Sequence, residues 1–280
     1  LPRPLLYPRL AARPTWRLTR YELPLTVGKA FDGCRTLHLT DLHVGRTNTD
    51  YLERVFRHCL LGKPDLVVIT GDLIDYEPHA LPLLRPLLKL LADARVPDGI
   101  TTIFGNHDYH EYSWRKVGKR SAHRAINKRL VVLVEGLGVR LLRNEQLLLR
   151  RDDDRLVIVG LDEMWSDLAD AEAAFAGLGV NDPVLCLQHN PDGVEFLKPF
   201  PWQYMLTGHS HGGQALLPGV GALYVPMEHR EYLQGFFHFA PLEGQRVGRR
   251  TMFVSRGLGY STPIRLRCPP EATLFTVRSV

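Results

Sequence analysis

Five short motifs along the chain contain residue types that bind divalent metal ions. They supply carboxylates, imidazoles and one amide, which bind hard to borderline divalent ions through oxygen and nitrogen. The motifs are Asp41-Leu42-His43, Gly71-Asp72, Gly105-Asn106-His107-Asp108, His189 and Gly208-His209-Ser210-His211. Each motif is weak alone. Together they predict one dinuclear metal site, whose chemistry is attack of metal-bound hydroxide on phosphorus.

The spacing within the motifs favours side chains that converge on a cation. Asp41 and His43 are two residues apart at the predicted end of a strand, so in a regular strand they point the same way. His209 and His211 repeat this spacing. Asn106 offers a neutral amide oxygen, which adds no charge that would repel a phosphate. The candidate ligands are numerous enough for two ions that share one bridging group.

Short apolar runs precede the motifs and predict buried strands. These runs cover residues 35–39, 66–69, 101–104, 184–187 and 204–206. Helices are predicted between the first three runs, at Asp50–Leu61 and Ala80–Ala94. This alternation predicts βαβ units, in which functional residues sit where strands end. The glycine before Asp72 lets two backbone segments approach closely. Further strands are predicted at residues 131–134, 139–142, 146–149, 156–160, 222–225, 251–254 and 274–277.

These elements predict an α/β fold, a four-layer αββα sandwich of two mixed sheets flanked by helices, with the metal ligands at one sheet edge. With 280 residues and 45% hydrophobic content, the chain can bury one large core. We expect a single domain over residues 26–280, after a basic, proline-rich arm over residues 1–25. The four cysteines show no metal-binding or disulfide spacing, which favours reduced structural thiols.

The net charge is concentrated in the arm. Residues 1–20 contain five arginines and no acid, which equals the whole net charge of +5. The rest of the chain is balanced, and this argues against nucleic acid as a partner. The arm mixes arginine with leucine and tryptophan, so it favours contact with an anionic membrane surface or an extended strap on the domain. Both interpretations stay open.

In this order, the five motifs resemble those of the calcineurin-like metallophosphoesterases over about residues 35–215. The resemblance implies two divalent metal ions, manganese being favoured, with iron or zinc as alternatives. It implies that Asp72 bridges the two ions and that His107 is a general acid or stabilises charge on the phosphate. Asp108 would orient His107 and raise its pKa. The implied ligands are Asp41, His43, Asp72 and His211 for the first ion, and Asp72, Asn106, His189 and His209 for the second.

Later segments narrow the resemblance to one branch of the family. Gly212-Gly213-Gln214, Ser255–Gly259 and Pro263-Ile264-Arg265 are similar to bacterial YaeI/YkuE-type phosphodiesterases. This branch includes a UDP-2,3-diacylglucosamine hydrolase of lipid A synthesis. The resemblance therefore implies a phosphorylated small molecule or lipid as substrate.

A basic segment follows the G-N-H-D motif directly. Residues 109–130 carry aromatic side chains and seven basic ones, which predicts a lid that binds substrate phosphate or faces an anionic lipid surface. An ordinary solvated helix is the competing interpretation. The candidate substrate contacts are Arg115, Lys116, Lys119 and Arg256.

The sequence thus predicts a dinuclear metal-dependent phosphohydrolase that cleaves a phosphodiester or pyrophosphate. We expect a cytoplasmic protein, peripheral on the inner membrane face, with UDP-2,3-diacylglucosamine as the most concrete substrate. A cyclic-nucleotide or general phosphodiesterase or nuclease is the first alternative. A catalytically silent scaffold with this fold is the second, although no ligand position is lost.

Overall fold

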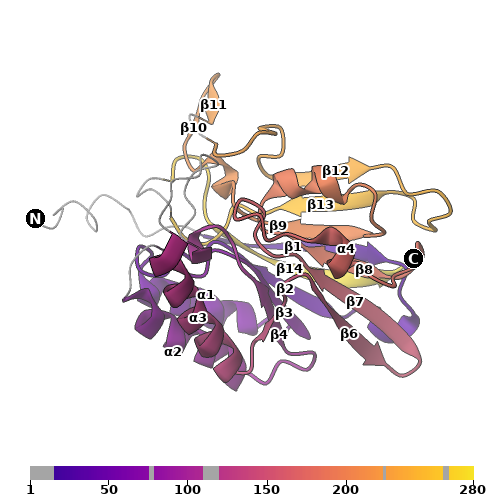
Figure 1. Cartoon of the computed structure of the whole chain (residues 1–280), viewed down its shortest axis with the longest axis horizontal. Helices are drawn as coiled ribbons and strands as arrows, with labels where there is room; N and C mark the ends of the chain where they lie inside the picture. Colours follow the sequence, from indigo (N-terminus) through magenta and orange to yellow (C-terminus); the bar gives the residue numbers. More distant parts are fainter. Residues whose placement is uncertain (1–15, 76–78, 110–119, 223–224, 261–264) are drawn as a thin grey trace, which may run out of the picture.

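The computed structural model describes residues 16–75, 79–109, 120–222, 225–260 and 265–280. Within these residues the chain forms two six-stranded mixed sheets that pack against each other, with helices on their outer faces (Figure 1). Buried side chains from both sheets, including Phe275 of one and Tyr204 of the other, share one apolar cluster between them. The predicted αββα sandwich of two mixed sheets is confirmed.

The first sheet has the strand order β1-β14-β2-β3-β4-β5. Strands β2 to β5 run parallel, β14 is antiparallel to β2, and β1 is parallel to β14. The strands are β1 (Arg17–Leu25), β2 (Arg35–Leu39), β3 (Leu66–Thr70), β4 (Ile100–Ile103), β5 (Arg140–Leu141) and β14 (Glu271–Ser279).

Strand β1 shortens the predicted N-terminal arm. The arm was expected to extend over residues 1–25, but Arg17–Leu25 pair with β14 in continuous register, from Arg17 opposite Glu271 to Leu25 opposite Ser279. Leu23 and Leu25 are fully buried in the cluster between the sheets, which explains why this segment joins the domain. Residues 1–15 of the predicted arm lie outside the described residues.

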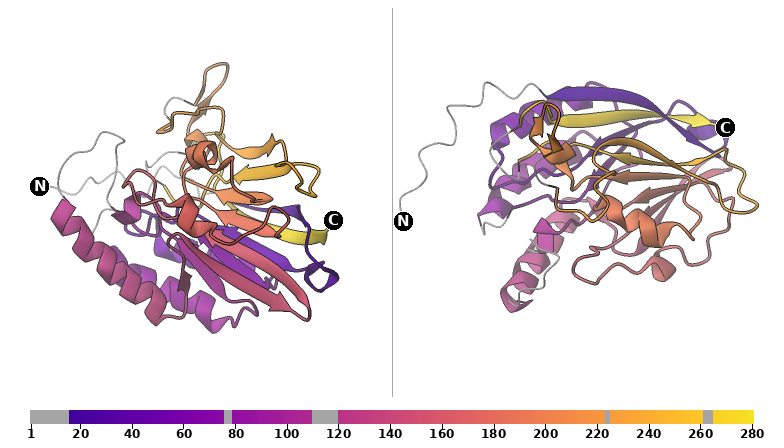
Figure 2. Two further views of the ribbon diagram at one scale, coloured as in Figure 1. Left: turned by 45° about the vertical axis from the view of Figure 1, so that its right-hand side comes forward. Right: turned by 90° about the horizontal axis from the view of Figure 1, so that it is seen from above.

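The second sheet has the order β12-β13-β9-β8-β7-β6. Its four central strands are parallel, and both edge strands are antiparallel to their neighbours. The strands are β6 (Glu145–Arg151), β7 (Asp154–Gly160), β8 (Val184–Leu187), β9 (Tyr204–Thr207), β12 (Gly235–Phe239) and β13 (Arg250–Val254). A small hairpin of β10 (Leu216–Leu217) and β11 (Gly221–Ala222) extends beyond the sheets in Figures 1 and 2.

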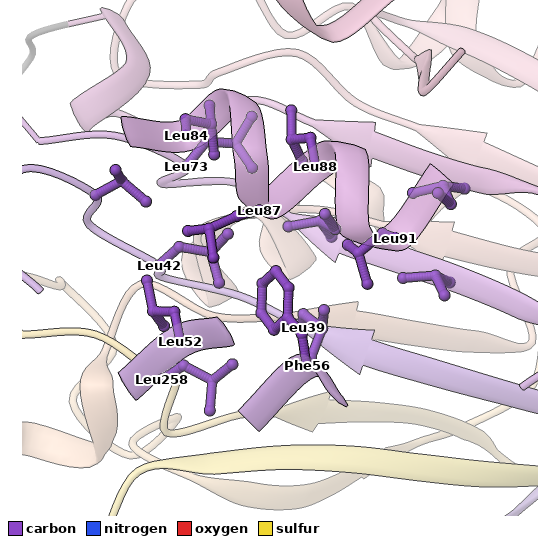
Figure 3. Packing of buried hydrophobic residues seen from close by; sticks show 14 of the residues in the cluster. Leu39, Leu42, Leu52, Phe56, Leu73, Leu84, Leu87, Leu88, Leu91 and Leu258 are labelled. Atoms are coloured by element: carbon purple, nitrogen blue, oxygen red, sulfur yellow. The ribbon is translucent and has the colours of Figure 1, made fainter. Parts of the chain in front are cut away.

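Helices cover the outer faces of both sheets. Figure 3 shows Leu52 and Phe56 of α1 and Leu84 to Leu91 of α2 packed on the residues that follow β2 and β3. On the other side, Ala174 of α4 and Leu197 of α5 join a cluster with the second sheet. The helices are α1 (Thr49–Leu60), α2 (Ala80–Asp93), α3 (Arg120–Gly136), α4 (Ala171–Ala174) and α5 (Val194–Leu197), with 3-10 turns η1 (Lys29–Phe31), η2 (His107–Tyr109), η3 (Pro191–Gly193) and η4 (His211–Gly213).

One predicted strand is wrong. Residues 131–134 were expected to be extended, but they lie within α3. Leu130 and Val134 are buried in the cluster with α1 and α2, whereas Val132 is 72% exposed. This burial follows a helical period, so packing against α2 outweighs the β-branched composition of the run. No helix among the described residues is long and apolar enough to cross a bilayer.

Candidate metal centre

Each candidate ligand follows the C-terminal end of a central strand. Because β2, β3 and β4 are parallel, as are β8 and β9, the loops after them meet at one edge of the sandwich. Asp41 and His43 follow β2, Asp72 follows β3, Asn106 follows β4, His189 follows β8, and His209 and His211 follow β9.

The backbone at these residues is unusual. Five of the seven candidate ligands have positive φ, a conformation that is uncommon for residues other than glycine and that can mark a functional site when such residues cluster. The sequence predicts that Asp41 and His43 continue the strand, but their φ angles of 53° and 45° show that they do not. Their side chains converge because the loop turns sharply. The other three are Asp72 (52°), His209 (66°) and His211 (50°).

Gly71 supports the close approach that the sequence predicts. It has φ of 89°, and a methyl group at its Cα would lie 2.5 Å from the amide nitrogen of Gly105. The loops after β3 and β4 can touch only because Gly71 has no side chain. This contact brings Asp72 next to the loop that carries Asn106.

The first ligand group consists of Asp41, His43, Asp72 and His211. One ligand atom from each lies within 4.8 Å of all the others. Nε2 of His43 is 2.9 Å from Nε2 of His211 and 3.5 Å from Oδ2 of Asp72. Nε2 of His211 is 3.5 Å from Oδ1 of Asp41. Two imidazole nitrogens and two carboxylates therefore converge on one point.

The second ligand group consists of Asp72, Asn106, His189 and His209. Nε2 of His189 lies 3.2 Å from Oδ2 of Asp72 and 3.2 Å from Oδ1 of Asn106. Nδ1 of His209 lies 2.9 Å from the same Asn106 oxygen. Asp72 Oδ2 thus faces a histidine of each group, whereas its Oδ1 accepts a hydrogen bond from the amide of His107 at 2.9 Å. A carboxylate oxygen between two sets of donors is suited to bridge two cations.

All seven side chains are buried, with at most 5% of each residue exposed. Burial lowers the pKa of His43 and of His209 to about 3, so both imidazoles are neutral and can donate a lone pair. Burial raises the pKa of Asp41 to about 6. Burial also acts to raise the pKa of Asp72, but nearby histidines, His189 first, hold it well below its usual range. The neutral nitrogens of His43 and His209 and the buried carboxylates fit divalent cations. Burial acts to lower the pKa of His189, but Asp72 outweighs it and raises the pKa to about 10, so an ion that binds this ring must displace a proton.

Hydrogen bonds outside the ligand groups orient two of the rings. His189 donates from Nδ1 to the carbonyl of Thr70 at 2.7 Å, which directs Nε2 into the second group. His209 donates from Nε2 to the carbonyl of Pro226 at 3.2 Å, which directs Nδ1 into the same group. Such contacts fix the tautomer of a metal-binding histidine.

His107 lies beside the first ligand group with a carboxylate behind it. Its ring makes an edge contact with that of His43, with centroids 4.5 Å apart, and its Nδ1 is 2.9 Å from Oδ1 of Asp75. Burial alone would lower the pKa of His107, but Asp72 and Asp75 outweigh it and raise the pKa. The protonated form that an acid requires is therefore favoured. Asp75 also forms an ion pair with Arg46.

Asp108 does not have the predicted orienting position. Its carboxylate accepts hydrogen bonds from the amides of Gly105 at 2.9 Å and Ile74 at 3.1 Å, so it ties the loop after β4 to the loop after β3. Asp75 takes the place beside His107 instead. Sequence analysis missed Asp75, although a second acid three residues after Asp72 was a usable signal.

Of the four predicted substrate contacts, Arg256 is the one that lies among the described residues. The guanidinium of Arg256 forms an ion pair with Glu271 of β14, and its backbone amide donates to the same carboxylate at 3.0 Å. Residues 110–119 of the predicted lid, with Arg115, Lys116 and Lys119, lie outside the described residues, and residues 120–130 belong to α3.

Trp165 was also missed, and it lies against the second ligand group. Its ring makes an edge contact with that of His209, with centroids 4.7 Å apart. Glu163 holds this loop by accepting hydrogen bonds from the amides of Trp165 at 3.0 Å and Ser166 at 2.6 Å. Asp162 anchors its start, because it accepts hydrogen bonds from the Tyr109 hydroxyl and Arg143. The acidic pair therefore presents a tryptophan to the site.

Comparison with known proteins decides the family. Residues 34–213 match the model of the calcineurin-like phosphoesterases. The chain belongs to this family. Calcineurin-like phosphoesterases bind two divalent metal ions and hydrolyse phosphoric esters, so this protein is a metal-dependent hydrolase. The two ligand groups offer enough donors of the right type for both ions.

Several relatives within the calcineurin-like phosphoesterases match most of the chain. It is 31% identical to the uncharacterized metallophosphoesterase YkuE of Bacillus subtilis, over 89% of this chain and 80% of YkuE. It is 30% identical to the phosphodiesterase YaeI of Escherichia coli, over 86% of this chain and 81% of YaeI. It is 29% identical to the UDP-2,3-diacylglucosamine pyrophosphatase LpxG of Chlamydia muridarum, over 92% of this chain and 88% of LpxG.

Proposed function

We propose that this protein hydrolyses a phosphodiester or pyrophosphate bond at a dinuclear metal site. Asp41, His43 and His211 would hold one ion, Asn106, His189 and His209 the other, and Asp72 would bridge them. The observation that carries the proposal is the position of Asp72 Oδ2, within 3.5 Å of a nitrogen in each ligand group.

The chain's own residues have distinct tasks in this reaction. Two bound divalent ions would supply an activated water and neutralise charge on the phosphate. His107, protonated and oriented by Asp75, donates a proton from Nε2 to the leaving oxygen or a hydrogen bond to the phosphate. Its side chain is 15% exposed, more than those of the histidines in the ligand groups, so substrate can reach the ring.

For the physiological substrate we propose a lipid-linked nucleotide pyrophosphate, such as UDP-2,3-diacylglucosamine. The similarity to LpxG supports this choice, since it extends over most of both chains. The similarity to YaeI favours the alternative, a general or cyclic-nucleotide phosphodiesterase or nuclease.

Metal removal tests the proposed chemistry. Treatment with a chelator should abolish hydrolysis of bis(p-nitrophenyl) phosphate, and added manganese should restore it. Activity that persists after the chelated metal has been removed would contradict the proposal. No activity with any metal would favour the silent scaffold.

A substrate comparison tests the finer proposal. UDP-2,3-diacylglucosamine should give a higher kcat/KM than a cyclic nucleotide or an aryl diester, measured with the same manganese-loaded protein. A preference for the cyclic nucleotide would replace the lipid substrate with the alternative.

Manganese, with iron or zinc as alternatives, and a peripheral position on the cytoplasmic face of the membrane are further parts of the proposal. Elemental analysis of protein purified without added metal tests the first. Co-sedimentation with anionic and neutral vesicles tests the second.

A further inference from the structure

Arg265 reaches from the segment before β14 to the back of His211. Its Nη1 donates hydrogen bonds to the carbonyls of His211 at 3.1 Å and Arg256 at 2.8 Å. Its Nη2 donates to the carbonyl of Gly259 at 2.5 Å and lies 3.1 Å from Nδ1 of His211. One guanidinium therefore contacts both the backbone and the ring of a proposed ligand.

The loop that Arg265 holds also supports Asp41. The amide of Gly259 donates to the carbonyl of Asp41 at 2.6 Å, and the amide of Leu258 donates to that of Thr40 at 3.1 Å. Gly257 has φ of 69°, and a methyl group there would lie 2.7 Å from Cβ of Asp41. Arg265 thus joins the two loops that carry Asp41 and His211.

Both residues belong to the first ligand group, and within the described part of the chain Arg265 makes no hydrogen bond to a residue of the second. Among the described residues Arg265 forms no ion pair with a carboxylate, and its buried Nε has no hydrogen-bond partner. A guanidinium enclosed mainly by carbonyls is costly to bury. A planar fork with several donors can, however, hold several carbonyls in fixed relative positions, which lysine cannot.

We propose that Arg265 is a positioning residue for the first metal ion. Through the carbonyls of His211 and Gly259 it fixes the backbone of His211 and the loop under Asp41, so that these ligands are arranged before the ion binds. The proposal rests on the proposed dinuclear site. It goes further in assigning this residue to only one of the two ions.

Arg250 provides a matched control. It is also a buried arginine that donates to backbone carbonyls, those of Ala240 at 2.8 Å and Lys198 at 2.8 Å, and it lies over the Trp202 ring. Arg265 lies similarly over the Tyr260 ring. Arg250 begins β13, however, at the end of the strand away from the ligand groups.

The experiment compares manganese binding by wild-type protein and by Arg265→Met, Arg265→Lys and Arg250→Met. Bound manganese is counted by elemental analysis, titrated calorimetrically, and examined by electron paramagnetic resonance for coupling between two ions. We expect the wild type and Arg250→Met to bind two coupled ions. In Arg265→Met one ion should bind about 10- to 100-fold more weakly and the coupled signal should give way to that of a single ion.

Kinetics and the lysine variant separate positioning from general stability. The kcat of Arg265→Met should fall with little change in KM for an aryl phosphodiester, and Arg265→Lys should lie between this variant and the wild type in metal affinity. If Arg265→Met does not fold, the lysine variant carries the test. Two tightly bound, coupled ions in a folded Arg265 variant would overturn the role of Arg265. A wild-type protein that binds no pair of ions would instead overturn the proposed function.

Discussion

The two ligand groups share Asp72 but differ in what surrounds them. In the second group, the rings of His189 and His209 are fixed by neutral backbone carbonyls, those of Thr70 and Pro226. In the first group, His211 faces the guanidinium of Arg265, and Nδ1 of His43 has no hydrogen-bond partner among the described residues. The first group therefore depends on a charged side chain, whereas the second depends on neutral backbone carbonyls, one of which, that of Thr70, is as remote in sequence from its ligand as any contact of Arg265.

The residues that lie beside the two ligand groups also differ in chemical type. His107, an ionisable ring backed by Asp75 and Arg46, lies beside the first group. Trp165 lies beside the second group and offers an apolar ring. From this contrast we expect His107 to take part in proton transfer beside the first group, and Trp165 to shape the site beside the second.

The largest effect is expected from replacing Asp72, the residue that the two ligand groups share. Asp72→Asn should weaken both ions at once and lower kcat/KM by about 10³-fold or more, equivalent to about 4 kcal/mol of transition-state stabilisation. Metal content and steady-state kinetics of the purified variant measure this. Retention of two tightly bound ions would show that the groups are independent of Asp72.

The next largest effect is expected from replacing His107 or Asp75, which lie beside the first ligand group but are not proposed ligands. His107→Asn should lower kcat by about 10²- to 10⁴-fold while two ions stay bound, because the proton donor is lost and no ligand is removed. Asp75→Asn should act in the same direction but less strongly. Asp108→Asn is the control, and it should lower the free energy of unfolding rather than kcat. A larger loss of kcat in Asp108→Asn than in Asp75→Asn would show that Asp108 orients His107, as the sequence predicts.

The smallest effect is expected from replacing Trp165, which lies beside the second ligand group. Trp165→Leu should weaken binding of one ion by less than about tenfold, since an edge contact between aromatic rings contributes about 0.5 to 1.5 kcal/mol. Calorimetric titration with manganese measures this change, with His107→Asn as a variant whose metal affinity should not move. A loss of kcat with unchanged metal affinity would place Trp165 in the reaction instead.

The sequence predicted the candidate metal ligands better than the residues that hold these ligands in place. The apolar runs of β2 and β8 matched the observed strands because their residues are buried on both faces, whereas residues 131–134 joined a helix through contacts that sequence does not reveal. The motif histidines could be recognised by type and spacing. Asp75 and Arg265 act through contacts made only by the folded chain, Arg265 over 54 residues of separation from His211.

The positive φ angles at five candidate ligands have a consequence for the stability of the whole fold. A left-handed residue other than glycine costs about 1 to 2 kcal/mol, so five together approach the net stability of a typical domain, about 5 to 15 kcal/mol. The sheets and their apolar clusters must supply this energy. Any ion that binds the native site but not the unfolded chain would return part of it, so bound metal would raise the free energy of unfolding of the whole domain.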